Sequence, residues 1–205
     1  MSGNVEEPDA NGHDPIVNIR GERVALGPLH RRLLPYFERW DNHFRTADLG
    51  GGDPRPVTAE EIAAHWEPLL RGERADWIGF AVYRLPDLRP IGVANLRDFT
   101  NAHGTAEFGI TIGAEEERGK GYGTEAVRLL LDYAFTVLGL HNVWLDTAAY
   151  NLGAIRAYEK AGFREIGRRR GARLIAGKRY DIVLMDCVAD EFIPPASRVM
   201  PEALG

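Results

Sequence analysis

Hydrophobic residues recur along the chain at two spacings, one typical of helices and the other of strands. Helices are predicted over 30–40, from Thr58 onward, where Thr58 and Glu61 have the spacing of a capping box, and over 151–161. The clearest helix lies between Thr124 and Gly139, and its apolar stripe consists of Val127, Leu130, Leu131, Ala134, Phe135 and Leu138. Alternating polar and apolar residues predict strands over 22–29, 77–85, 90–99, 106–113 and 142–149, and a final pair within 163–188 around the turn 171–177.

This order of elements predicts one domain of the mixed α/β (α+β) class. The segment 106–148 runs strand, helix, strand within a series of hairpins. It implies a twisted, mixed sheet, mostly antiparallel, of about seven strands with helices on both faces. Residues 1–15, rich in Gly, Asn, Asp and Pro, are expected to form a flexible leader, 16–190 the domain, and 191–205 a loosely held C-terminal tail.

Composition narrows the functional classes. Lys plus Arg number 25 and Asp plus Glu 30, and the formal net charge of -5 argues against nucleic-acid binding and mildly favours small cationic partners. Cys187 is the single cysteine, which excludes an internal disulfide and fits a reducing compartment. The start of the chain lacks the apolar core of a signal peptide, and Arg128 and Asp132 interrupt the most apolar run. We therefore expect a cytoplasmic protein with no membrane partner.

The stretch EEERGKGYGTEA, residues 115–126, carries the strongest chemical signal. Gly119, Gly121 and Gly123 stand at alternate positions just where the clearest helix begins. The first N–H groups of a helix have no partner within the helix, and its dipole places partial positive charge there. Because glycine lets an anion approach those groups closely, the loop is interpreted as an anion cradle, with a simple chain-reversing turn as the alternative.

Two other phosphate-binding motifs match this loop less well. A Walker loop requires Ser or Thr after Gly-Lys, but Lys120 is followed by Gly121. A dinucleotide fingerprint fits better, since Gly121, Gly123 and Ala126 match its spacing. Its glycines should follow the strand directly, however, and here residues 114–120 intervene.

The combined motifs resemble the GCN5-related N-acetyltransferases (GNAT), in the branch with ribosomal-protein and spermidine N-acetyltransferases. Arg118-x-x-Gly121-x-Gly123 looks like the family's acyl-CoA loop, and YNLGAIRAYEKAGF (150–163) is similar to its second motif. The resemblance covers roughly residues 16–188. Leu152 and Gly153 stand where proline and a larger residue are common in relatives, which predicts a less rigid helix start.

The resemblance implies a cofactor site for acetyl-CoA. Asn151 and Ala154 lie on one helix face that would follow the pantetheine arm, although Asn151 alone would also be explained as a helix N-cap. The splayed strand would contribute backbone at Ile110 and Ile112. The residues expected to hold the diphosphate are Arg118, Gly119, Lys120, Gly121, Tyr122, Gly123 and Thr124.

Two residues are candidates for the chemistry. By resemblance Tyr158 would donate a proton to the departing thiolate; its alternative role is that of a core aromatic. Glu107 shares a strand face with Gly109 and Thr111 and is the candidate base for the acceptor amine, or else a solvated charge near the strand start. Asp98 and Asp146 are weaker candidates.

The sequence allows several kinds of amine as the acceptor of the acetyl group. Polyamines, aminoglycosides and protein N-termini all fit. The residues that crowd the expected entrance, between the N-terminal helices and the sheet, are Tyr36, Phe37, Trp40, His43, Trp66 and Trp77. No histidine spacing indicates a metal site. The arginine-rich run 168–173 fits a solvated turn, a contact between subunits or a basic rim for the adenosine phosphates, so the sequence allows a homodimer. A non-catalytic acyl-CoA-binding module and a nicotinamide-dependent oxidoreductase are the alternative functions.

Overall fold

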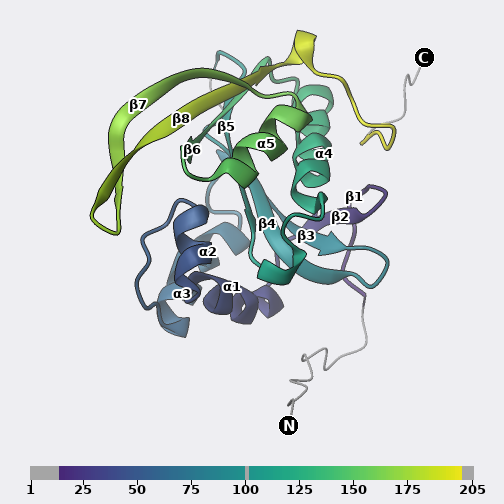
Figure 1. Cartoon of the computed structure of the whole chain (residues 1–205). Coiled ribbons are helices and arrows are strands. Elements are labelled where there is room, and N and C mark those ends of the chain that lie inside the picture. The colour runs from purple at the N-terminus through teal and green to yellow at the C-terminus, as the bar shows by residue number, and fades with distance from the viewer. Residues whose placement is uncertain (1–13, 100–101, 200–205) are drawn as a thin grey trace, which may run out of the picture.

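The computed structural model describes residues 14–99 and 102–199 and shows one mixed sheet with helices packed against it (Figure 1). The sheet has eight strands in the order β1-β2-β3-β4-β5-β6-β8-β7. The strands are β1 (Ile19–Arg20), β2 (Val24–Pro28), β3 (Trp77–Arg84), β4 (Arg89–Arg97), β5 (Thr105–Ile112), β6 (Asn142–Ala148), β7 (Arg164–Ile175) and β8 (Lys178–Val188). The helices are α1 (Leu34–Asp41), α2 (Phe44–Leu49), α3 (Ala59–Leu70), α4 (Tyr122–Thr136) and α5 (Leu152–Ala161), with short 3-10 turns at Arg31–Leu33, Glu115–Glu117 and Ala189–Glu191.

The predicted mixed, mostly antiparallel sheet is confirmed, and the structure adds two short elements. The additional strand β1 has two residues, with Ile19 opposite Leu26 of β2. Helix α2 has six residues and lacks the repeated apolar stripe from which helices are predicted. The capping box of Thr58 and Glu61 is present at the start of α3.

Several predicted boundaries differ from the structure, and two of the differences have a clear backbone cause. Helix α4 begins at Tyr122 rather than Thr124, because Gly121 takes the left-handed conformation that ends the loop. The turn between β7 and β8 is only Ala176 and Gly177 instead of 171–177. Both residues have positive φ, 49° and 74°, which is the backbone of a tight two-residue hairpin.

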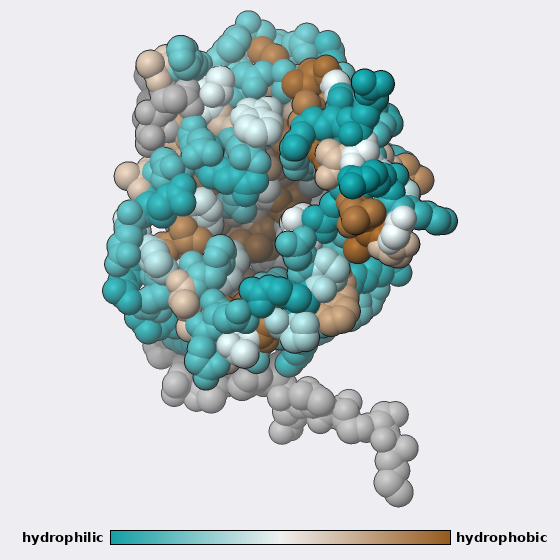
Figure 2. All heavy atoms as spheres, turned by 90° about the vertical axis from the view of Figure 1, so that its left-hand side faces the viewer, coloured by the Kyte–Doolittle hydropathy of each residue, from teal (hydrophilic) through white to brown (hydrophobic). Residues whose placement is uncertain are grey.

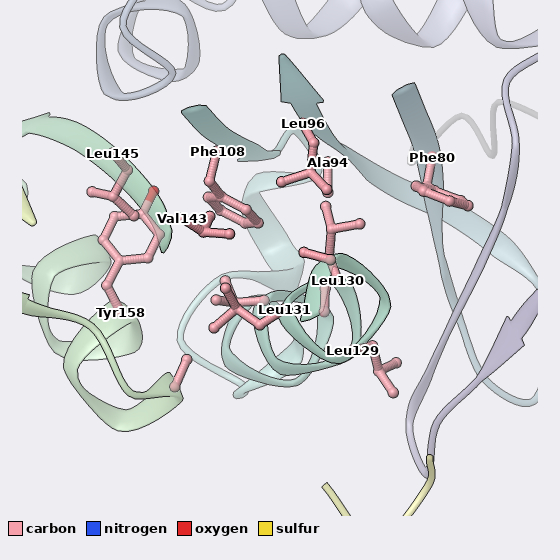
Figure 3. Packing of buried hydrophobic residues seen from close by; sticks show 14 of the residues in the cluster. Phe80, Ala94, Leu96, Phe108, Leu129, Leu130, Leu131, Val143, Leu145 and Tyr158 are labelled. Carbon is pink, nitrogen blue, oxygen red and sulfur yellow. The ribbon is translucent and has the colours of Figure 1, made fainter. Parts of the chain in front are cut away.

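Helices cover both faces of the sheet, as the alternation of side chains predicts. Along β3, Phe80 and Val82 belong to the cluster that includes α4 and α5, whereas Ala81 and Tyr83 belong to the cluster with α1 and α3. Figure 3 shows three leucines of α4 packed beneath the sheet: Leu129, Leu130 and Leu131. Each fully buried leucine contributes about 1.5–3 kcal/mol, so α4 is held mainly by packing.

Strands β5 and β6 separate after a short parallel ladder. Their pairing covers only Thr105–Glu107 opposite Asn142–Trp144. Beyond that point β5 stays paired with β4 as far as Ile112, and β6 stays paired with β8 as far as Ala148. The two strands therefore diverge and leave a split in the sheet, as the resemblance implied.

The segment that follows β8 packs against α4. The ring centroids of Phe192 and Phe135 lie 5.3 Å apart. Arg198 pairs with the carboxylate of Asp132 at 3.2 Å, and the backbone N–H of Val199 donates to the same carboxylate at 2.7 Å. Asp132 is fully buried in the middle of α4. This arrangement differs from the loosely held tail expected from the sequence. The leader up to residue 13 and the last residues, 200–205, lie outside the described part, and the domain limits 16–190 stay a prediction.

We predict that Arg198→Ala lowers the free energy of unfolding by about 3 kcal/mol, because it leaves the buried Asp132 carboxylate without its cation. Urea unfolding at pH 7 measures this change. Arg164→Ala is the matched control: Arg164 pairs with Glu191 on the surface, and its removal should change stability by less than about 1 kcal/mol. Equal effects of the two substitutions would contradict a structural role for the C-terminal segment.

Candidate functional site

A groove of about 540 Å³ lies along the split. It is formed by α2, the diverging part of β5, the glycine loop, the start of α4, and α5. The space-filling view in Figure 2 shows the side of the molecule at the left of Figure 1 hollowed near its centre, with hydrophobic residues at the floor and a hydrophilic rim. The predicted cofactor residues that line the groove are Arg118, Gly119, Gly121, Gly123, Thr124, Ile110, Ile112, Asn151 and Ala154, and the predicted acid Tyr158 lines it too.

The glycines of the loop serve two different purposes. Gly119 and Gly121 have φ of 73° and 87°, a left-handed backbone that other residues rarely adopt. Gly123 lies within α4 without positive φ, and a side chain there would meet only Ile112 at 3.5 Å. Its missing Cβ therefore keeps the helix backbone bare toward the groove. Among the described residues no side chain caps α4, so its first N–H groups are left uncapped at the positive end of the helix dipole.

The acidic residues before the loop fasten it to neighbouring elements. Glu115 lies 3.3 Å from Nε2 of His43 and 3.8 Å from Arg45, both at the start of α2. Glu116 pairs with Arg89 of β4 at 3.0 Å. These exposed pairs are individually weak, but together they tie the loop to two separate parts of the fold.

Glu117 is the buried member of this acidic run. Its side chain is 2% exposed and binds both Lys120, at 2.9 Å, and Arg84 of β3. The hydrogen bond from Lys120 and the nearby Arg84 guanidinium lower the pKa of Glu117, so the carboxylate stays charged at neutral pH. The side chain of Lys120 thus holds the loop together instead of lining the groove.

Arg118 connects the loop to the split strand and to α2. Its Nε donates to the carbonyl of Ile112 at 2.8 Å, and its Nη2 donates to Oγ1 of Thr46 at 2.7 Å. Burial lowers the pKa of Arg118. The side chain is engaged by the protein, so Arg118 shapes the groove, and its own contact with a ligand stays a prediction.

The outer side of the loop is braced by Arg23. Arg23 donates to the carbonyl of Lys120 at 3.0 Å, pairs with Glu125 of α4 at 3.3 Å, and lies 5.9 Å from the ring centroid of Tyr122. Tyr122 packs partly against the hydrophobic core. Of the predicted cofactor residues, Tyr122 and Lys120 are thus outside the described lining of the groove.

The edge of β5 that faces the split carries backbone groups that β6 does not pair beyond Glu107. The N–H of Gly113 bonds to Ile91 of β4, whereas the carbonyl of Ile112 points away from β4 and accepts from Arg118. In a strand, the N–H and C=O of one residue point to the same side, and so do those of the residue two positions away. The backbone groups of Ile110 and Ile112 therefore face the split.

Asn151 begins α5 and anchors it. Its Oδ1 accepts from the N–H of Ala154 at 3.3 Å, which is an N-cap, and its Nδ2 donates to the carbonyl of Leu49 at the end of α2. The cap explanation is thus confirmed. A second role for Asn151 along a cofactor arm stays a prediction.

Tyr158 lies between α5 and the sheet. The side chain is 7% exposed and packs edge-on against Phe108 and Phe163. Figure 3 shows its hydroxyl end directed toward the sheet beside Leu145. Within the described part of the chain the hydroxyl has no hydrogen-bond partner, and burial, together with the charge of Asp146, raises the pKa of Tyr158. The group is therefore a protonated donor at neutral pH.

Glu107 does not line the groove. It lies at the last β5 position paired with β6 and forms an ion pair with Arg97, its neighbour on β4. Its side chain is 16% exposed. The role of Glu107 as a base stays a prediction, and the structure shows its carboxylate engaged by a guanidinium.

A polar cluster that sequence reasoning missed joins α2 to the β7–β8 hairpin. Asp48 accepts from the hydroxyl of Tyr150 at 2.7 Å and from Arg173 at 2.8 Å, and Arg173 also donates to the carbonyl of Gly52 at 2.5 Å. Tyr150 lines the groove. No local pattern could have revealed this cluster, because Asp48 lies more than 100 positions from both Tyr150 and Arg173.

The aromatic residues expected at the acceptor entrance are mostly core. Phe37 and Trp40 are buried, and the ring centroids of Phe37 and Trp66 lie 4.3 Å apart. Tyr36, Trp40 and His43 line a separate cavity of about 190 Å³.

Residues 14–99 and 102–199 contain neither a cluster of metal-binding side chains nor a helix suited to crossing a membrane. No group of His, Cys, Asp or Glu there is arranged to hold a metal ion, and the absence of a metal stays a prediction. No helix there is long and apolar enough to cross a membrane.

Comparison with known proteins agrees with this fold and groove. Residues 23–164 match the family described as acetyltransferase (GNAT) domain. The spermidine N(1)-acetyltransferase of Escherichia coli (strain K12) is 36% identical over 163 residues, which span 79% of this chain and 84% of that protein. A Vibrio cholerae protein of the same name is 35% identical over 103 residues, 50% of this chain and 59% of that protein. A protein of Bacillus subtilis (strain 168), provisionally named a ribosomal N-acetyltransferase, is 32% identical over 67% of this chain and 74% of its own length.

A solved structure shows the same architecture. The crystal structure of spermidine N-acetyltransferase from Vibrio cholerae in complex with CoA and spermine superposes with a TM-score of 0.73 at 27% identity, over 82% of this chain and 96% of that one. The split sheet and the bare helix start are those of an acyl-CoA-dependent acyltransferase. The chain belongs to the GNAT acetyltransferase family, and acetyl-CoA is its cosubstrate. The nicotinamide alternative is thereby set aside.

We predict that Gly121→Ala weakens CoA binding about tenfold, because the backbone at φ 87° becomes strained and the new Cβ meets Arg23. The same strain should lower stability by about 1–2 kcal/mol. Isothermal titration with CoA and urea unfolding measure the two effects.

Gly177→Ala is the control for backbone strain. Gly177 has φ 74° in the β7–β8 turn, with nothing within 4 Å of an added Cβ. It should lose comparable stability and keep its CoA affinity. Unchanged CoA affinity in Gly121→Ala would contradict the cradle.

Proposed function

We propose that this acetyl-CoA-dependent N-acetyltransferase moves an acetyl group directly to a primary amine of a small, cationic acceptor of the polyamine type. The single observation that carries the proposal is the split itself: the bare amides of α4 lie along the same groove as Tyr158, whose hydroxyl has no partner among the described residues. A protein N-terminus and an aminoglycoside are the other acceptors that the fold class permits.

The groove fits acetyl-CoA on features of this chain. The amides at the start of α4 would hold the diphosphate, and the edge of β5 at Ile110 and Ile112 would bind the amide-rich arm. When bound, acetyl-CoA supplies the acetyl group as an activated thioester. The chain aligns the acceptor with it, excludes water and supplies a proton, and alignment alone can account for several kcal/mol of the barrier.

Tyr158 is proposed as the proton donor to the leaving sulfur. Burial keeps it protonated, and no described residue competes for its hydroxyl. A core aromatic of this kind would normally have its hydroxyl satisfied. No described residue bonds to the hydroxyl of Tyr158, which leaves it available to a ligand in the groove and supports a role in the reaction.

The acceptor class is supported by charge and by relatives. The chain has a formal net charge of -5. Two of the relatives compared above, from Escherichia coli and Vibrio cholerae, are named spermidine N(1)-acetyltransferases, and the solved relative was crystallised with spermine. Assembly as a homodimer, the absence of a nucleic-acid or membrane partner and a cytoplasmic location stay predictions.

Thiol release from acetyl-CoA should be observed with spermidine or spermine and confirmed by acetylated product in mass spectrometry. A peptide N-terminus and an aminoglycoside, tested in parallel, decide the acceptor class. Tight acetyl-CoA binding without turnover on any amine would favour the non-catalytic acyl-CoA-binding module instead.

Tyr158→Phe should lower kcat about 100-fold or more and leave KM for acetyl-CoA almost unchanged, because it removes only the proton donor. Burial raises the pKa of Tyr158, so its hydroxyl should stay protonated between pH 7 and 9. The wild-type rate should therefore not fall in that range through ionisation of this group. Tyr133→Phe is the control, a partly buried tyrosine of α4 packed against Phe80. Equal rates for the two variants would show that the Tyr158 hydroxyl has no chemical role.

A further inference from the structure

A buried hydroxyl lies in the wall of the groove and has no part in the proposed reaction. It belongs to Thr46 of the short helix α2, whose side chain is 1% exposed. Thr46 lines the groove and also the separate cavity of about 190 Å³, so it forms part of the wall between them. A polar group buried in such a place needs hydrogen-bond partners, and their identity shows what the residue does.

The hydroxyl of Thr46 both accepts and donates. Nη2 of Arg118 donates to Oγ1 of Thr46 at 2.7 Å, and Nε of Arg118 donates to the carbonyl of Ile112 at 2.8 Å. Oγ1 of Thr46 also lies 2.9 Å from Nδ1 of His43, whose Nε2 lies 3.3 Å from Glu115. Because a carboxylate can only accept, Nε2 of the neutral imidazole carries the hydrogen, and Nδ1 accepts from the hydroxyl.

This chain of bonds joins three elements that surround the groove. Arg118 directly precedes Gly119 of the loop, Ile112 is the last residue of β5, and Thr46 lies within α2. All three residues line the groove. The side chain of Arg118 therefore fixes the loop against the edge of the split strand on one side and against α2 on the other.

The guanidinium of Arg118 depends on the hydroxyl because it is withdrawn from water. Burial lowers the pKa of Arg118, so its charged form is already disfavoured at this place. Among the described residues its hydrogen-bond partners are one hydroxyl and one carbonyl oxygen, and no carboxylate pairs with it. Without the hydroxyl of Thr46, one N–H group would lose its acceptor. The guanidinium would then turn toward solvent and release the carbonyl of Ile112.

From this geometry we propose that Thr46 is a positioning residue for acetyl-CoA, which acts through Arg118 to hold the glycine loop against the edge of β5. The inference rests on the proposed place of acetyl-CoA in the groove and deepens it. Thr46 touches the loop side of the groove and forms no bond with Tyr158. Loss of its hydroxyl should therefore weaken the binding of the cosubstrate and leave the transfer step almost unchanged.

Thr46→Val removes the hydroxyl and nearly keeps the volume of the side chain. We expect the Kd for CoA, measured by isothermal titration, to rise about tenfold, and KM for acetyl-CoA to rise with it while kcat stays within about twofold. Thr46→Ser restores the hydroxyl and should recover most of this loss. Thr147→Val is the matched control: Thr147 is a buried threonine of β6 that does not line the groove, and its replacement should keep the CoA affinity.

A double-mutant cycle shows whether Thr46 acts through Arg118. In the background of Arg118→Met, Thr46→Val should raise the Kd for CoA by less than about twofold, because the bond that it removes is already gone. A general packing role of Thr46 would instead add the same tenfold loss in both backgrounds. Additive effects therefore overturn the inference.

Two further outcomes would overturn it. One is a CoA affinity of Thr46→Val within about threefold of wild type, and the other is a loss of affinity that Thr46→Ser fails to recover. If Thr46→Val does not fold, Arg118→Met tests the bond from its other end, and unchanged CoA affinity in that variant overturns the inference.

Gly121→Ala separates failure of the inference from failure of the proposed site. If Gly121→Ala weakens CoA binding and Thr46→Val does not, the inference fails and the place of acetyl-CoA stands. If Gly121→Ala leaves CoA binding unchanged, the proposed place of acetyl-CoA fails first, and the inference fails with it.

Discussion

The separation of β5 from β6 is the constraint on which the rest of the structure depends. Backbone groups inside a protein are normally paired, so a strand edge that opens within a sheet is stable only if something else satisfies it. Here Arg118 satisfies the carbonyl of Ile112, and the remaining groups face a groove. The start of α4 lies along this groove, and so does Tyr158. An extended thioester with an anionic end matches that arrangement.

The loop before α4 is rigid because charges hold it from several directions. Glu116 and Glu117 reach β4 and β3 through Arg89 and Arg84, and Arg23 binds the carbonyl of Lys120 from the other side. A fixed loop presents its amides without reorganisation when an anion binds, which is the condition under which such groups are most effective. The acidic run that precedes the glycines is therefore structural, although it stands beside a site for a negatively charged ligand.

Local sequence patterns predicted the helices, the strands and the anion cradle. The other features of the site depend on contacts between residues far apart in the sequence, which local patterns do not reveal. The stripe of α4, the glycine loop and the Asn151 cap are each readable within about fifteen residues. The pairing of Glu107 with Arg97 depends on the β4–β5 register, which the sequence leaves undetermined. Helix α2 is too short to show a pattern, and it supplies Thr46 and Asp48 to contacts that no spacing rule covers.

The central claim is that the amides around Gly121 and Gly123 bind the diphosphate of coenzyme A. A crystal structure with CoA bound tests this most directly. The account predicts phosphate oxygens within about 3 Å of those backbone nitrogens and the pantetheine arm along Ile110 and Ile112. Phosphate groups bound elsewhere, with the start of α4 facing only solvent, would contradict it.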